Sequence, residues 1–174
     1  MEAICPSGPH AGSAWPAGES LETLRDGLAE LSRRTEPPLR EVSAFLLSLA
    51  ALDSGAEGPG CFAGMLNCYD RFRQELDEAF ELAQSPAGLE GTRAEAISTH
   101  LERARRLLMD AASGIPHEIS QALRRAGANP GKFRIWGIDR HLDETGLLAS
   151  QLGDAAARWG RLATTSSAPP ISST

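Results

Sequence analysis

Side chains that could catalyse a reaction are few in this sequence and poorly grouped. Cys68 is a potential nucleophile if the fold brings His100 or His141 to it. Its place beside Tyr69, on the flank of an apolar stripe, is more typical of an inert packing cysteine. The sequence also lacks the Gly-x-Ser-x-Gly turn, a phosphate loop ending in Gly-Lys-Ser or Gly-Lys-Thr, and a dinucleotide-binding glycine fingerprint. We therefore expect a protein that is not an enzyme.

Acidic residues gather in one stretch with a helical pattern, namely Asp70, Glu75, Asp77, Glu78 and Glu81. Carboxylate metal sites in helical bundles usually add a Glu-x-x-His pattern, which this sequence does not contain. His117 and Glu118 are adjacent, but no second histidine follows to complete a zinc-protease helix. We expect the acidic residues to form a solvated helix face, with no metal ion and no cofactor.

A basic and partly aromatic segment is the first candidate binding site. From Arg103 to Arg140 the sequence carries eight basic and three acidic residues. The residues expected to form the patch are Arg124, Arg125, Lys132, Arg134, Trp136 and Arg140. Arginine forks suit anions and tryptophan suits a membrane interface, so the patch could bind phosphate, an acidic protein or an acidic membrane. The alternative is that arginines of this segment, such as Arg103 and Arg106, lie on solvated helix faces and that Trp136 covers the open end of the bundle.

A row of small residues is the second candidate site. Gly146, Gly153 and Gly160 recur every seven residues, with Ser150 and Ala157 between them on the same side of a predicted helix. A glycine costs about 1 kcal/mol relative to alanine inside a helix, so three in register indicate a compensating close approach. That approach is either tight packing of a neighbouring helix in the same fold, or a seam for a second chain or a ligand.

The elements that must position these residues are visible in the apolar pattern. Apolar residues recur at alternate steps of three and four, which is typical of amphipathic helices. We expect helices over residues 20–36, 39–52, 62–84, 92–113, 116–126 and 139–163. Ser20 and Asp139 are suitable N-caps, and Gly127 stands where a helix-ending glycine is favoured. The Pro37-Pro38 pair, and Gly114 with Pro116, are expected to end helices.

These apolar stripes must be hidden against one another. The sequence therefore predicts an all-α fold, an antiparallel bundle of four to five main helices plus one short helix. The 174 residues, of which 41% are hydrophobic and 23% charged, fit one domain. We expect that domain over residues 20–163, with a flexible N-terminal arm over 1–19 and a flexible Ser/Thr/Pro-rich tail over 164–174.

The cellular setting is predicted from what the sequence contains. The longest apolar stretches lie within residues 44–52, about half of the roughly 20 residues that a membrane-spanning helix requires. The first basic residue is Arg25, so the start of the chain lacks a secretory signal pattern. Three cysteines without a Cys-x-x-Cys pair do not indicate a disulfide framework. We expect a cytoplasmic protein, with export that leaves no cleavable signal as the open alternative.

Taken together, the sequence favours a non-enzymatic helical module that binds another protein or a second copy of itself, as an adaptor, chaperone, regulator or delivered effector. The alternative is a module that binds an anion or a lipid surface through residues 124–140. Duplex nucleic acid is not expected as a partner because the formal net charge is −6. The charge is uneven, since residues 1–90 carry 15 acidic and 6 basic groups, and this asymmetry can guide docking. No motif is specific enough to assign a family.

Overall fold

The computed structural model describes residues 20–53, 61–85, 91–125, 127, 129 and 138–166. The elements in these residues are four helices, α1 (Leu21–Asp53), α2 (Cys61–Gln84), α3 (Gly91–Arg125) and α4 (Ile138–Ser166). The described residues contain no strand, so the prediction of an all-α fold is confirmed for them. The predicted arm over 1–19 lies outside the described residues, as does most of the predicted tail, although α4 continues through residue 166.

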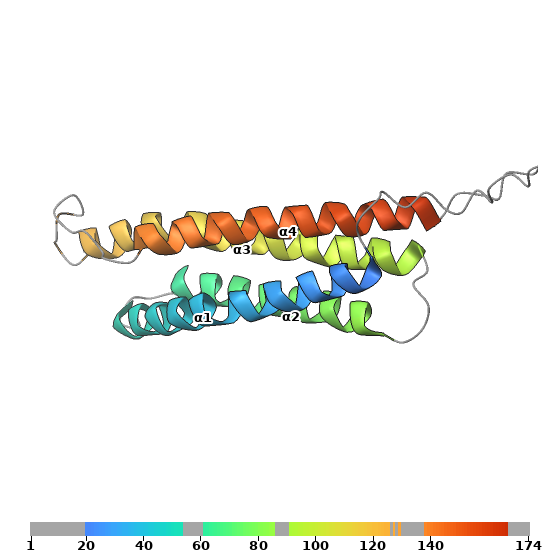
Figure 1. Cartoon of the computed structure of the whole chain (residues 1–174). Coiled ribbons are helices and arrows are strands. Elements are labelled where there is room, and N and C mark those ends of the chain that lie inside the picture. The colour runs from blue at the N-terminus through green and yellow to red at the C-terminus, as the bar shows by residue number, and fades with distance from the viewer. Residues whose placement is uncertain are drawn as a thin grey trace, which may run out of the picture.

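The four helices form an antiparallel bundle in which each successive helix reverses direction (Figure 1). Helix α3 packs against both α2 and α4, and α1 contacts α2 and α4, so the helices follow one another around a shared centre. None of the described helices combines the length and apolar character needed to cross a bilayer.

The number of helices differs from the sequence prediction because two predicted breaks are absent. Helix α1 continues through Pro37 and Pro38, and α3 continues through Gly114 and Pro116. A proline inside a helix costs about 3 kcal/mol relative to alanine. The buried stripe stays in register across both places. Its members there are Leu31, Thr35, Leu39 and Val42 in α1, and Ala111, Ala112, Ile115 and Ile119 in α3. Burial of these side chains offsets the local cost, so the helices run on.

The core consists of the apolar stripes that the sequence predicts. Its largest fully buried apolar side chains are Leu28 and Leu46 of α1, Phe62, Tyr69 and Phe72 of α2, Ile97, Leu101, Leu108 and Ile115 of α3, and Leu152 and Trp159 of α4. Alanines are also fully buried on the inner faces of α2 and α3, at Ala79, Ala83, Ala94 and Ala104. Burial of the apolar side chains is the main favourable term in such a bundle.

Two of the three residues predicted to stand at helix ends do so in the structure, and the third does not. The Thr23 amide donates to Ser20 Oγ at 3.1 Å, which confirms Ser20 as the N-cap of α1. Gly127 follows α3 with a positive φ of 73°, and its amide donates to the Arg124 carbonyl at 3.0 Å. Asp139 lies inside the first turn of α4 rather than before it, because α4 already begins at Ile138.

Candidate functional site

The predicted row of small residues on α4 divides into a covered part and an open part. A Cβ atom added at Gly160 would lie 3.3 Å from Ser98 Oγ of α3, and one at Gly153 would lie 3.4 Å from Arg105 Cδ. A Cβ atom added at Gly146 would meet no atom within 4 Å. The two other members of the row, Ser150 and Ala157, are exposed. Close packing against α3 therefore accounts for Gly160. Gly153 has room for an ordinary van der Waals contact with Arg105, and Gly146 is open toward the described residues.

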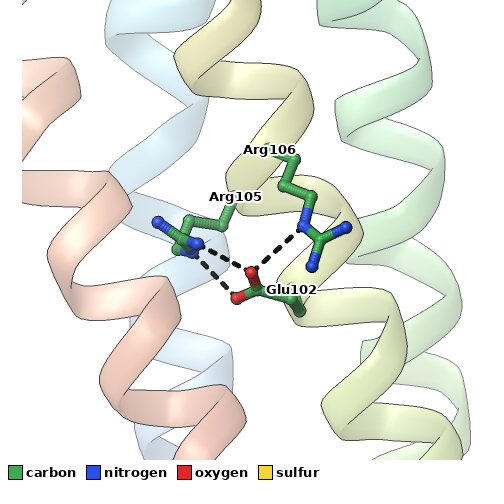
Figure 2. Close-up of polar contacts among 3 residues, drawn as sticks. All are labelled: Glu102, Arg105 and Arg106. Atoms are coloured by element: carbon green, nitrogen blue, oxygen red, sulfur yellow. Dashed lines mark hydrogen bonds and ion pairs between the residues drawn. The ribbon is translucent and has the colours of Figure 1, made fainter.

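Arg105 lies over Gly153 because an acidic neighbour on its own helix holds it there. Its Nε and Nη2 atoms donate to the two carboxylate oxygens of Glu102 at 2.8 and 2.7 Å, and Arg106 Nε donates to the same carboxylate at 3.2 Å (Figure 2). The hydrogen bond from Arg105, followed by that from Arg106, lowers the pKa of Glu102 to about 2. The two-pronged contact fixes the plane of the Arg105 guanidinium.

A shallow groove of about 430 Å³ runs between α3 and α4 beside this pair. It is lined by Glu102, Arg105, Met109, Gly146, Ala149, Ser150, Gly153 and Asp154. Met109 is 43% exposed, which is unusual for a large apolar side chain among the described residues. The groove therefore combines small residues and an exposed methionine with charged side chains at its rim. We call it the α3–α4 groove.

A second groove, of about 560 Å³, lies between α1 and α4 and is more charged. Pro37, Pro38 and the exposed Leu147 contribute its apolar surface. Its polar lining includes Arg140, whose Nε donates to Glu144 at 2.7 Å. Salt bridges already occupy several of its charged groups, so fewer of them are left for a ligand.

The predicted basic patch is described only in part. Arg124 and Arg125 are exposed in the last turn of α3, and Arg140 is exposed in the first turn of α4. These two helix ends lie at the same end of the bundle (Figure 1). The rest of the predicted patch, Lys132, Arg134 and Trp136, lies outside the described residues. Arg140 is paired with Glu144, which reduces the positive charge that it can offer to an anion.

A cluster of two carboxylates and an imidazole spans α2 and α3, and no sequence motif predicts it. His100 Nδ1 lies 2.7 Å from Glu75 Oε2 and 3.2 Å from Glu78 Oε2. The ligand atoms of the three residues all lie within 4.8 Å of one another. A motif search within one helix could not detect the cluster, because the histidine comes from the neighbouring helix. A usable signal was the place of His100 between the buried Ile97 and Leu101, since such flanking positions face an adjacent helix.

A second histidine enters a buried polar contact between α2 and α4. His141 Nε2 lies 3.1 Å from the Tyr69 hydroxyl and 3.3 Å from Thr145 Oγ1. Burial lowers the pKa of His141, against the opposing effect of Glu144 and Glu41, and burial raises the pKa of Tyr69. A neutral imidazole can accept a hydrogen bond from either hydroxyl, so the contact is a means of pairing polar groups within the core.

Cys68 is half-buried, next to Tyr69 on α2. The two histidines weighed as its partners make other contacts, since His100 meets the carboxylates and His141 meets Tyr69. The arrangement of these side chains supports packing as the role of the cysteine.

No protein-family model matches the chain, and comparisons with curated proteins and with solved structures gave no match.

Proposed function

We propose that the chain is a non-enzymatic protein-interaction module, and that its α3–α4 groove receives an apolar helix of a partner protein. The observation that carries the proposal is that Gly146 lines this groove and is open toward it, since an added Cβ would meet no atom of the described residues within 4 Å. A glycine inside a helix lowers helix stability by about 1 kcal/mol relative to alanine, and no side chain in the described part of the chain uses the space that Gly146 leaves. A partner that approaches the α4 backbone would use it.

The lining of the groove suits a helical partner. Gly146, Ser150 and Gly153 follow one another at steps of four and three, so they form a row on one face of α4. Small residues in such a row let a second helix approach closely. The exposed Met109 on the opposite wall adds a flexible apolar contact of the kind found at helix-binding grooves.

The polar rim supplies orientation. Glu102 and Arg105 hold each other on the α3 side, and Asp154 lies on the α4 side of the groove. A partner helix with apolar residues on one face and polar residues at its margins would match this arrangement. The partner is a different protein under this proposal, and a second copy of the chain is the other outcome that the test distinguishes.

The test compares the same substitution at two glycines, one that lines the α3–α4 groove and one that does not. Gly146→Leu fills the groove, and Gly64→Leu makes the same change at a helical position of α2 where an added Cβ also meets no atom within 4 Å. Proteins are captured from native extract with the wild-type chain and with each variant. We expect one protein to be retained by the wild type and by Gly64→Leu but lost with Gly146→Leu. A protein retained equally by all three contradicts the proposal.

Light scattering at two concentrations of the purified chain identifies self-association. Under the proposal the chain remains a monomer at both concentrations, and the captured protein is different from the bait. Concentration-dependent dimers that Gly146→Leu disrupts would instead assign the groove to a second copy of the chain.

The alternative function, binding of an acidic lipid surface, has support in the exposed Arg124 and Arg125 at the end of α3. Sedimentation with vesicles that contain acidic phospholipid tests it directly. The proposed interaction module predicts no difference between the wild type and Arg124→Glu. Vesicle binding that falls with salt and is lost in Arg124→Glu would favour the lipid function.

A further inference from the structure

We infer that Glu75, Glu78 and His100 form a binding site for one divalent transition-metal ion of the zinc class, held between α2 and α3. The site goes beyond the proposed interaction function. It lies on the contact of α3 with α2, whereas the groove lies on the contact of α3 with α4. The two proposals can therefore fail independently.

The first support is the convergence of three ligand atoms from two helices. Glu75 and Glu78 are three residues apart on α2, so their carboxylates share one face of that helix. His100 reaches them from α3, with its Nδ1 atom 2.7 and 3.2 Å from one oxygen of each carboxylate. Ligands on regular helices are held more firmly than ligands on loops.

The second support is the spacing of the ligand atoms. Zinc binds nitrogen and oxygen ligands at about 2.0–2.2 Å, which places neighbouring ligands of a tetrahedral ion roughly 3.4 Å apart. The three ligand atoms of this cluster lie within 4.8 Å of one another. Small side-chain rotations would bring them to the tetrahedral spacing. His100 Nδ1 and Glu75 Oε2 share a hydrogen bond at 2.7 Å, and a bound ion would replace this contact.

The third support is charge and donor type. Two carboxylates and a neutral imidazole carry a formal charge of −2, which a divalent cation balances. An imidazole ligand favours zinc and its neighbours in the transition series over magnesium and calcium, which prefer oxygen ligands throughout. The nitrogen donor is therefore what assigns the class of ion.

The fourth support is access. The side chains of Glu75 and His100 are each 18% exposed, whereas that of Glu78 is 60% exposed. The cluster is thus sheltered on the helix-packing side and open on the Glu78 side, where an ion can enter. Three protein ligands with water in the remaining position is a common arrangement for zinc.

The experiment measures binding of zinc to the full chain by equilibrium dialysis. Two variants remove single ligands, His100→Gln and Glu78→Gln. Two matched controls change the same residue types elsewhere on the same helices, His117→Gln on α3 and Glu81→Gln on α2, both at exposed positions. Cobalt in place of zinc reports the ligand type through its visible and near-ultraviolet absorption.

We expect the wild type and both controls to bind one zinc ion per chain at this site. Loss of either ligand is expected to weaken binding by about tenfold or more, since even outer-shell changes weaken metal sites by about 10–100-fold. Excess magnesium should not displace the zinc. The thermal midpoint should rise on zinc addition in the wild type more than in the ligand variants, because the ion binds the folded state.

Equal zinc affinity in the wild type, His100→Gln and Glu78→Gln would overturn the inference. So would a cobalt spectrum dominated by thiolate bands, because that would place the ion on cysteine. Circular dichroism checks that each variant is folded. If His100→Gln does not fold, Glu78→Gln still decides the result, because the Glu78 side chain is largely exposed and lies outside the core.

Discussion

The Ser98 hydroxyl of α3 lies directly against the backbone of α4 at Gly160. It donates a 2.8 Å hydrogen bond to the carbonyl oxygen of Ala156, and a Cβ at Gly160 would lie 3.3 Å from Ser98 Oγ. About four turns toward the start of α4, no side chain of the described residues takes the corresponding space beside Gly146. The same glycine repeat thus serves helix packing at one end and borders an open groove at the other.

Replacing the two glycines by alanine should give different changes in the free energy of unfolding. Gly146→Ala should stabilise the chain by about 1 kcal/mol, because alanine favours the helix and the space is open. Gly160→Ala should raise the free energy of unfolding by less than that, or lower it, because the new methyl group crowds Ser98. Urea unfolding measures both values. An equal gain at the two positions would contradict the close contact between Ser98 and Gly160.

The buried contact of His141 predicts how stability depends on pH. Burial holds the pKa of His141 below its ordinary value of 6.5, so the unfolded chain binds the proton more readily than the folded chain. The contribution of this group to the free energy of unfolding should therefore fall as the pH drops below 6.5 toward the lowered pKa.

The comparison with His141→Gln isolates that contribution. Urea unfolding between about pH 7.5 and about pH 5.5 should show a shallower loss of stability in the variant, since glutamine takes up no proton in this range. His100 and the other titratable groups are common to both proteins and cancel in the difference. Parallel pH profiles would show that the folded state accommodates the charged imidazole.

The Glu102–Arg105 pair predicts an unusually acidic carboxyl group. NMR titration should give Glu102 a pKa of about 2 in the wild type, and the pKa should move toward the usual 4.5 in Arg105→Gln. Because the folded-state pKa is lowered, the pair stabilises the fold above the ordinary pKa and loses that effect as the pH falls through about 2. High salt should weaken the shift, since the pair is partly exposed. A wild-type value near 4.5 would contradict the two-pronged contact.

The buried stripe of α4 predicts that a leucine-to-alanine change lowers the free energy of unfolding much more inside the stripe than outside it. Leu152 is fully buried, whereas Leu147 is 61% exposed on the same helix. Leu152→Ala should lower the free energy of unfolding by about 2–5 kcal/mol, because it removes buried methyl groups and leaves a cavity. Leu147→Ala should change it by less than about 0.5 kcal/mol. Similar losses from the two variants would mean that the stripe is not the core.

The fold was largely predictable because burial leaves a periodic trace in the sequence. The apolar steps of three and four identified the inner face of every described helix, and Ser20 and Gly127 marked helix ends through local chemistry. The breaks at Pro37-Pro38 and at Pro116 were predicted wrongly. Proline propensity is a local quantity, whereas burial of residues on both sides depends on neighbouring helices that a sequence window does not contain.

The sequence predicted only those features of the candidate sites that lie within a single helix. The seven-residue glycine repeat was visible, but which α3 side chain covers each glycine depends on the register between α3 and α4. That register left Gly146 open and placed Arg105 over Gly153. The contact of His100 with Glu75 likewise joins residues 25 positions apart, and no spacing rule within one helix relates them.

Site-specific photo-crosslinking in native extract tests the proposed interaction surface most directly. A photoreactive side chain replaces Met109, which lines the α3–α4 groove, and in a matched chain it replaces Leu47 of α1, which is 59% exposed and outside the lining of that groove. The proposed function predicts a crosslinked partner from position 109 that is absent from position 47 and disappears when Gly146→Leu is added. Equal crosslinking from both positions, or a product at position 109 that Gly146→Leu leaves unchanged, would contradict it.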